Sequence, residues 1–318
     1  MNLEEAADNP SAIDPASLAE REIGPVTILF GFENGKYPFG NSMLVRGEKQ
    51  TAIIDPCLGV IPRAGSLPDI DLVIHSHTHE DHIAATYLFK NKPWHAHAAD
   101  GLGLESIEGL MAIYGFADGP VYDGFKHEIE TRFNYPGAGD LHLFEDGHEF
   151  DLGGVQVKVI HTPGHTRGHC CLEVIWGEAA ADRLVYLGDI ELTGFGPYYG
   201  DAWSDLEDFE RSIEKLKHVD ARYWLTFHHK GLVESREQFL KMLDAFASMI
   251  DKREAALLDY IEAPRTLEEI VQHRFVYRPG YEGLMVDAIE ERSMSMHLDR
   301  LVRDGRVAQE GDRYRALS

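Results

Sequence analysis

A short run of metal-ligand residues constrains this sequence more than any other feature: His77-Thr78-His79-Glu80-Asp81-His82. Imidazole and carboxylate are the usual ligands of zinc and of other borderline divalent metals. Residues 77 and 79 leave a predicted strand, DLVIHS, two positions apart, so their side chains point to the same side. Asp81 and His82 follow where the chain turns towards a predicted helix, at a second location close by. One loop can therefore serve two adjacent metal positions.

Three further segments place candidate ligands at the ends of predicted strands. His165 lies in the loop HTPGHTRGH, where a proline and two glycines make a tight turn that permits a close approach. Asp189 follows the strand RLVYL through a glycine, although Gly-Asp alone more often marks a helix cap or a turn. A late strand, YWLTF, ends in His228-His229-Lys230-Gly231. The fold must bring these three strand ends to the first loop.

The order of predicted elements favours a layered α/β architecture. Short strands rich in branched and aromatic residues are predicted within residues 26–54 and 71–76, and again within 142–189 and 223–227. Amphipathic helices are predicted over residues 204–219 and 234–261. Two strand-rich halves with helices between them indicate a sandwich of sheets and helices.

The chain divides into three predicted parts. Residues 1–22 are acidic, contain prolines and lack an apolar period, so we expect a loosely ordered leader. Residues 23–254 form the expected catalytic domain. Residues 255–318 contain two predicted helices and a hairpin with the turn Glu310-Gly311-Asp312, a pattern typical of a small winged-helix-like domain.

Taken together, the motifs HxHxDH, TPGH, Gly-Asp and a late strand-terminal histidine resemble the metallo-β-lactamase fold superfamily over residues 25 to 250. The resemblance implies a four-layer αββα sandwich that carries the C-terminal helical domain as an addition. It also implies a binuclear site, in which His77, His79 and His165 hold one metal, Asp81, His82 and the late histidine hold the other, and Asp189 bridges them. The family often has Gly-His-Gly at the late motif; here we favour His229, with His228 as the alternate.

The same resemblance implies a metal-dependent hydrolase. Two divalent cations would lower the pKa of a shared water from 15.7 to about 7 and so generate a bridging hydroxide, with Asp81 as the catalytic residue that orients it. Zinc is the expected ion, and iron or manganese are alternatives for a site without thiolate.

The leading hypothesis for the substrate is a small molecule with an acyl bond, either a thioester, a lactone or another ester. The superfamily also includes β-lactamases, phosphodiesterases and nucleases, so a phosphodiesterase or ribonuclease is the second hypothesis. Aromatic residues at Phe39, Tyr198 and Tyr199 are candidate walls of the substrate cleft, with ordinary loop packing as the alternative.

A third hypothesis is a DNA-binding regulator that acts through the C-terminal domain. Basic residues lie on or near its last predicted helix: Arg292, Arg300, Arg303 and Arg306. Acidic residues are interleaved with them, which is more typical of a solvated helix face. We expect the tail to pack instead on the catalytic domain or on a second subunit, and to cover the mouth of the cleft. A homodimer is therefore one of the possible states.

Composition limits the partners and the compartment. The formal net charge of −24 would repel a long anionic polymer, so nucleic acid is not the expected partner. No signal pattern and no apolar run near the ~20 residues of a membrane span are present, and we expect a cytoplasmic protein without a membrane partner. Only Cys57, Cys170 and Cys171 occur, which indicates no disulfide framework.

Three more histidines flank the predicted ligands: His75, His161 and His169. One interpretation is that they orient the ligands or contact the substrate, and the other is that they are hydrogen-bonded structural residues at strand ends. The sequence leaves both interpretations open.

Overall fold

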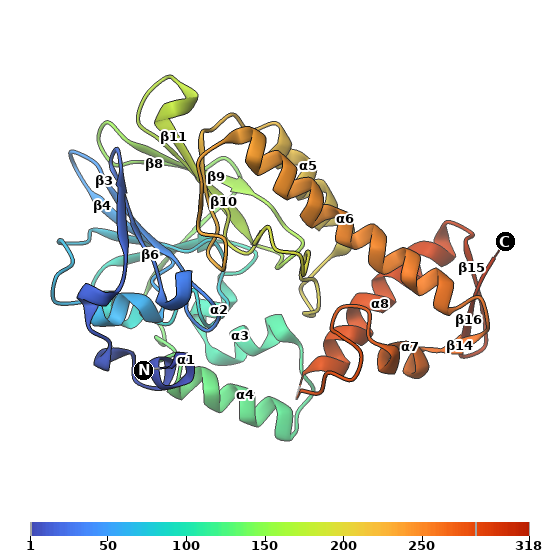
Figure 1. Cartoon of the computed structure of the whole chain (residues 1–318). Coiled ribbons are helices and arrows are strands. Elements are labelled where there is room, and N and C mark those ends of the chain that lie inside the picture. Colours follow the sequence, from blue (N-terminus) through green and yellow to red (C-terminus); the bar gives the residue numbers. More distant parts are fainter. Residues whose placement is uncertain (1, 284, 318) are drawn as a thin grey trace.

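The computed structural model describes residues 2–283 and 285–317, and it contains two large sheets with helices on both outer faces (Figure 1). The first sheet has the order β1-β2-β3-β4-β5-β6-β7, and the second has the order β13-β12-β11-β10-β9-β8. The strands of the first sheet are β1 (Glu20–Ile23), β2 (Val26–Leu29), β3 (Ser42–Arg46), β4 (Thr51–Ile54), β5 (Leu72–Ile74), β6 (Pro93–His97) and β7 (Asp140–Phe144). Those of the second are β8 (Glu149–Asp151), β9 (Gln156–His161), β10 (Cys170–Ile175), β11 (Arg183–Tyr186), β12 (Tyr223–Leu225) and β13 (Leu232–Val233).

The helices cover the outer faces of these sheets and build the C-terminal part. They are α1 (Leu3–Asp8), α2 (Leu102–Glu105), α3 (Ile107–Tyr114), α4 (Pro120–Thr131), α5 (Leu206–Lys217), α6 (Arg236–Tyr260), α7 (Leu267–His273) and α8 (Val286–Arg303). A third, small sheet has the order β14-β16-β15 and consists of β14 (Arg265–Thr266), β15 (Val307–Glu310) and β16 (Arg313–Ala316). Among the described residues, no helix combines the length and the apolar character needed to cross a bilayer.

Side-chain alternation along the first sheet separates two cores. Met43 and Ile54 belong to the core between the two sheets, whereas their neighbours Leu44 and Ile53 belong to the core on the other face, beneath α2, α3 and α4. Because successive side chains of a strand point to opposite faces, apolar residues at consecutive positions bury both faces of the sheet.

The second sheet repeats this pattern. Leu172 and Leu184 face the core between the sheets, while Cys171 and Val185 pack with α5 and α6 on the opposite side. The expected four-layer order of helix, sheet, sheet and helix is present, and Cys171 is a buried core residue.

Parallel strand pairs set the position of the chemistry. In the first sheet β4 and β5 are parallel, and in the second β11 and β12 are parallel. Because the carboxyl ends of parallel strands meet at one edge, the segments after β4 and β5 lie together, as do those after β11 and β12. The loops that follow β5, β11 and β12 carry all the predicted ligands except His165, which follows β9.

The N-terminal segment differs from the expected loose leader. Residues 2–22 contain α1, which begins with a capping box between Asn2 and Glu5, and end in β1, which pairs antiparallel with β2. Ala6 and Ala7 are buried in the core outside the first sheet. The small side chains of these two alanines let the helix pack closely on the core, although its composition is acidic.

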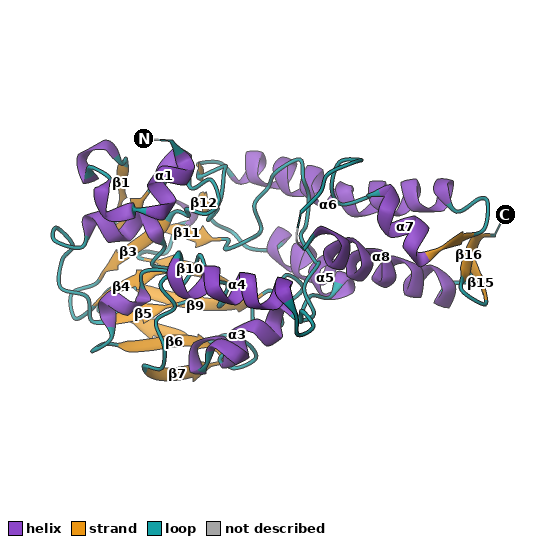
Figure 2. Cartoon of the chain, turned by 90° about the horizontal axis from the view of Figure 1, so that it is seen from below, coloured by secondary structure: helices purple, strands orange, loops and turns teal. Residues whose placement is uncertain are grey.

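Helix α6 joins the sandwich to the C-terminal part without a linker (Figure 2). Its Phe246 and Ile250 pack beneath the second sheet, and its Leu257 packs in the core of the C-terminal part. Buried Arg253 donates hydrogen bonds to the carbonyls of Pro197 and Phe195. The expected boundary between residues 254 and 255 therefore falls inside one continuous helix.

The arginines near the last helix bind this chain itself. Arg292 Nη1 donates to Tyr114 O at 2.6 Å, and Arg300 Nη1 donates to Glu210 Oε2 at 2.8 Å. Arg303 pairs with Glu207, and Arg306 with Glu254. The guanidinium groups that the sequence offers for phosphate are used to hold α8 against α3, α5 and α6, so the C-terminal part packs on the catalytic part as expected.

We expect Leu172→Ala to destabilise the fold, because Leu172 is fully buried in the central strand β10 between the two sheets. The expected loss in the free energy of unfolding is about 2–5 kcal/mol, from lost burial and the cavity left behind. The matched control is Leu143→Ala on β7, where the side chain is 51% exposed. Chemical denaturation should show little change for the control, and equal losses in the two variants would contradict the layer assignment.

Candidate metal centre

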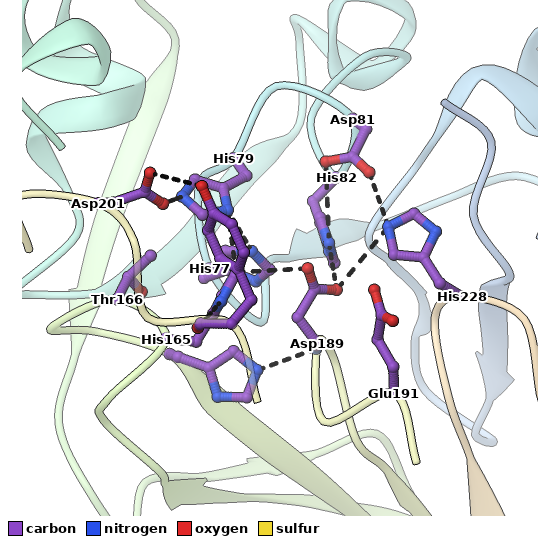
Figure 3. A network of polar contacts seen from close by, with 12 residues as sticks. His77, His79, Asp81, His82, His165, Thr166, Asp189, Glu191, Asp201 and His228 are labelled. Carbon is purple, nitrogen blue, oxygen red and sulfur yellow. Dashed lines mark hydrogen bonds and ion pairs between the residues drawn. The ribbon is translucent and has the colours of Figure 1, made fainter. Parts of the chain in front are cut away.

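Three imidazoles and one carboxylate converge at the edge where the two sheets meet: His77, His79, His165 and Asp189 (Figure 3). His77 Nε2 lies 3.2 Å from His79 Nδ1, and His79 Nδ1 lies 3.0 Å from His165 Nε2. His165 Nε2 lies 3.3 Å from Asp189 Oδ2. The loop after β5 supplies the first two ligands, and the loops after β9 and β11 supply the others.

These distances fit a divalent cation better than they fit hydrogen bonds. Ligand atoms about 2.0–2.1 Å from a zinc ion at tetrahedral angles lie about 3.3 Å from one another. A neutral imidazole has a single acceptor nitrogen, so three ring nitrogens that meet at one point cannot all be satisfied by one another. The donor set therefore suits a borderline metal such as zinc.

A second set lies beside the first and consists of Asp81, His82 and His228, with Asp189 between the two sets. His82 Nε2 lies 3.0 Å from Asp189 Oδ1, and His228 Nε2 lies 2.9 Å from Asp81 Oδ2. Asp189 thus directs Oδ1 to the second set and Oδ2 to the first. This is the arrangement of a carboxylate that bridges two metal positions.

The late histidine of the cluster is His228, which corrects the preference for His229. His228 Nδ1 donates to Gly35 O at 2.8 Å, which leaves Nε2 free to face Asp81. His229 adopts a left-handed backbone conformation, with φ of 61°, and its side chain is exposed. His229 lines the cleft, but among the described residues it belongs to neither ligand set.

A buried aspartate that the sequence analysis missed fixes the orientation of His82. Asp55 Oδ2 accepts a hydrogen bond from His82 Nδ1 at 2.7 Å, and Asp55 Oδ1 accepts one from Ser76 N at 2.7 Å. A carboxylate behind a metal-binding imidazole fixes its tautomer and raises its basicity. The available signal was the strand QTAIID, which ends in a carboxylate at the same sheet edge as DLVIHS.

Two other ligands are oriented by backbone contacts. His165 Nδ1 donates to Tyr198 O at 3.1 Å, so Nε2 carries the lone pair that faces the cluster. His169 Nε2 accepts from Asp189 N at 3.1 Å and therefore holds the bridging residue in place. His75 contacts Thr86 and the His95 carbonyl, and His161 contacts the Arg167 carbonyl. Of the three flanking histidines, only His169 thus supports a candidate ligand.

Glycine is required at two points of the ligand loops. A Cβ at Gly164 would lie 2.3 Å from the backbone of Phe209, and the residue has φ of +129°. A Cβ at Gly188, which has φ of +53°, would lie 2.5 Å from His169 Nε2. These close approaches let the turns before His165 and Asp189 reach the cluster.

The electrostatic environment favours the ligand forms of His77 and Asp189, whereas a carboxylate beside His79 favours its protonated form. Burial lowers the pKa of His77 well below its usual value, so the ring is neutral at pH 7. Burial raises the pKa of Asp189, but the neighbouring His82 and His228 outweigh it and hold that pKa well below its ordinary range. Burial lowers the pKa of His79, yet Asp201, whose Oδ2 lies 3.2 Å from His79 Nε2, raises it to about 9. Asp189 therefore stays anionic between the two sets.

The two sets open into a cleft of about 910 Å³. Its floor is formed by candidate ligands, and its walls carry aromatic and aliphatic side chains from α3, α4 and the C-terminal part: Tyr114, Phe116, Phe125, Tyr277, Tyr281, Met285, Val286 and Ile289. The C-terminal part therefore covers the mouth of the cleft, as the sequence analysis expected.

The structure supports one of the three aromatic wall residues expected from the sequence. Tyr198 lines the cleft and donates from its hydroxyl to Asp201 Oδ1 at 3.1 Å. Phe39 and Tyr199 do not, which corrects both assignments. Phe39 is fully buried outside the first sheet, and Tyr199 is buried and pairs its hydroxyl with His297 Nε2 at 3.0 Å.

Two acidic residues of the cleft also escaped the sequence analysis. Glu80, within the first motif, accepts hydrogen bonds from the hydroxyls of Tyr37 and Tyr114, and burial raises its pKa to about 7. Glu191, two residues after the bridging aspartate, lies near His228, and burial raises its pKa to about 7 as well.

Comparison with known proteins gives a consistent family. The family described as "Metallo-beta-lactamase superfamily" matches residues 36–245. Among curated proteins, acyl-coenzyme A thioesterase MBLAC2 of Gallus gallus is 26% identical over 227 residues, which cover 65% of this chain and 75% of that protein. The protein of the same name from Homo sapiens is 27% identical over 213 residues, with 59% and 72% covered.

Two solved structures share the fold over most of their length. A metallo-beta-lactamase family protein from Thermus thermophilus has a TM-score of 0.69 at 20% identity, with 92% of this chain and 99% of that chain covered. A beta-lactamase domain protein from Burkholderia ambifaria has a TM-score of 0.65 at 18% identity, with 95% and 98% covered.

Asp55→Asn should weaken metal binding at the second set, because an amide in place of the carboxylate cannot accept equally from both Ser76 and His82. We expect about a 10- to 100-fold lower affinity for one of two metal ions, measured by competition with a chromogenic chelator. The control is Asp71→Asn, which alters an aspartate that accepts from a backbone amide, that of Thr51, away from the cluster. Unchanged affinity in Asp55→Asn would contradict the role given to Asp55.

His228→Ala and His229→Ala separate the two neighbouring imidazoles. We expect His228→Ala to lose one of two bound metals after dialysis, because it removes a ligand of the second set, while His229→Ala keeps both. Elemental analysis of the two purified variants measures this directly. Loss of metal from His229→Ala alone would restore the assignment that the sequence first suggested.

Proposed function

This chain belongs to the metallo-beta-lactamase superfamily and is a hydrolase of that superfamily, and we propose that it cleaves the acyl bond of a small molecule, with a thioester as the leading substrate class. The observation that carries the proposal is that the two ligand sets lie at the floor of a cleft with aromatic walls. A lactone or another ester would present the same carbonyl to the same groups.

We assign His77, His79 and His165 to one divalent ion, Asp81, His82 and His228 to a second, and Asp189 to both, with zinc the expected ion of the first position. When bound, such ions lower the pKa of a shared water to around 7 and polarise the carbonyl of the substrate. Carboxylates behind the imidazoles, such as Asp55 behind His82, keep the ligating nitrogens facing inward.

Asp81 is the proposed catalytic residue. Its Oδ2 is buried, and among the described residues no group makes a hydrogen bond of acceptable geometry with it, although His228 Nε2 lies 2.9 Å away. Because Asp81 also lines the cleft, this oxygen can accept a hydrogen bond from the attacking water and direct its lone pair at the carbonyl. The aromatic wall excludes other water from the reacting bond.

Two observations favour an acyl bond over a phosphodiester. The cleft is lined by several carboxylates besides Asp81, and Lys230 is the lysine in its lining. A phosphodiester would bring negative charge to the reacting bond itself, beside these carboxylates, whereas the carbonyl of a thioester is neutral and the aromatic wall suits a partly apolar acyl group. The curated relatives named as acyl-coenzyme A thioesterases support the thioester.

The C-terminal part has a role in this proposal as a wall of the cleft. Two helices and a sheet of order β14-β16-β15 fit the expected winged-helix-like module, built on the end of α6. Its arginines bind carboxylates and carbonyls of this chain, which leaves little positive charge for DNA. We therefore place residues 255–318 with the substrate site.

A substrate panel tests the proposal: acyl-coenzyme A and acyl-glutathione thioesters, lactones, β-lactams and bis-p-nitrophenyl phosphate, with metal analysis on the same sample. We expect turnover of thioesters by the metal-loaded protein and its loss after chelation. Turnover of the phosphodiester alone would overturn the order of the hypotheses.

Asp81→Ala should lower the turnover of the best substrate by about 10²- to 10⁴-fold, because it removes a ligand and misplaces the water. The variant should be assayed with its metal content restored by excess ion. Asp69→Ala, an exposed aspartate remote from the cleft, is the control and should keep full activity. Near-normal activity of metal-replete Asp81→Ala would refute the catalytic assignment.

A further inference from the structure

The turn after β11 directs two carboxylates, rather than one, towards the metal centre. Along residues 189–191, Ile190 is buried beneath the second sheet, while Asp189 and Glu191 on either side of it both line the cleft. Leu192 then adopts a left-handed conformation, with φ of 56°, and is buried. An apolar side chain in that conformation is unusual, and the surrounding core must hold it there. Buried neighbours on both sides therefore fix the direction of Glu191.

The carboxylate of Glu191 faces the second ligand set. Figure 3 shows it on the same side as Asp189, directed to the space between Asp189 and His228. One ligand atom from each of Asp189, Glu191 and His228 lies within 4.8 Å of the others, which are distances that one ion could span. Glu80, the other glutamate of the cleft, is instead held by Tyr37 and Tyr114.

No strong partner in the protein accounts for this position of Glu191. Among the described residues, its one side-chain hydrogen bond comes from Thr193 Oγ1 to Oε2 at 3.5 Å, which is long for a hydroxyl donor. A carboxylate that lies among ligand atoms of Asp189 and His228 without a strong donor of its own suits a cation at that place.

The two sets consequently differ in chemistry. The first offers three imidazoles and one oxygen of Asp189, a donor set that suits zinc. In the second, Asp81 and His82 lie with His228, and Asp189 and Glu191 lie with the same His228, so carboxylates outnumber imidazoles there. Zinc is usually bound by four ligands, many of them nitrogen or sulfur. A position with more ligands, most of them oxygen, suits a harder ion such as manganese better.

We propose that Glu191 is an additional ligand of the second metal position and that it makes this position selective for a harder ion such as Mn²⁺, while the first position keeps zinc. The proposal rests on the metal centre of the proposed function but not on its substrate. It extends that assignment by one ligand and by a difference in metal preference between two adjacent sites.

Titration of the full-length, metal-free protein with Mn²⁺ after one equivalent of Zn²⁺ tests this, with free Mn²⁺ followed by its electron paramagnetic resonance signal. We expect wild type to bind one Mn²⁺ beside the zinc, and Glu191→Gln to bind it at least about 10-fold more weakly, with zinc affinity at the first position unchanged. Glu191→Asp keeps the charge on a shorter side chain and should give an intermediate loss. Circular dichroism confirms that each variant is folded.

Glu80→Gln is the matched control, because it removes the same charge from the same cleft without removing a carboxylate directed at the second set. An equal loss of Mn²⁺ affinity in Glu80→Gln would show that Glu191 acts only through general negative charge, which overturns the proposal. Wild-type affinity in both folded Glu191 variants would overturn it too. If wild type binds only one ion of any kind, the binuclear centre of the proposed function fails instead.

Discussion

The site depends on the contacts of the Asp189 carboxylate, because its two oxygens face two different groups of buried imidazoles. Oδ1 lies 3.0 Å from His82 Nε2, and Oδ2 lies 3.3 Å from His165 Nε2. Burial of this many polar groups is unfavourable unless each is paired or coordinates a cation. The scaffold must therefore hold the strand ends of both sheets at fixed positions. The packed core between the sheets, which includes Leu172 and Ile54, provides that rigidity.

The residues behind the ligands matter as much as the ligands themselves. Asp55, His169 and the carbonyls of Gly35 and Tyr198 each take one hydrogen bond that fixes a ring or a carboxylate. These partners come from segments far apart in the sequence, so the geometry of the site is a property of the whole sandwich. The same holds for substrate access, since α6 and α8 carry the C-terminal part onto the cleft and its side chains complete the wall.

The two halves of the centre are chemically unequal, and the inequality arises from a single turn. The chain after β11 returns to the core at Ile190 and Leu192, which leaves Asp189 and Glu191 on the side of the cleft. An imidazole-rich position and a carboxylate-rich position then lie next to each other and share the carboxylate of Asp189, one oxygen each. With the proposed role of Glu191, such a centre would combine a zinc ion with a second, harder ion.

The sequence by itself determined the fold class and most of the candidate ligands, because both depend on local patterns. Apolar residues at consecutive positions specify strands with two buried faces. His77, His79, Asp81 and His82 share one loop whose spacing is independent of the rest of the chain. Tertiary structure alone decided which side chains reach the centre from elsewhere. His228 rather than His229 joins the ligands because the chain turns at a positive φ. Phe39 and Tyr199 are buried in the core instead of lining the cleft. Arginines of the C-terminal part pair with nearby carboxylates of this chain. Asp55 and Glu191 join the site because strands and turns distant in sequence end at the same sheet edge, and the direction of a side chain there follows from packing that no local pattern encodes.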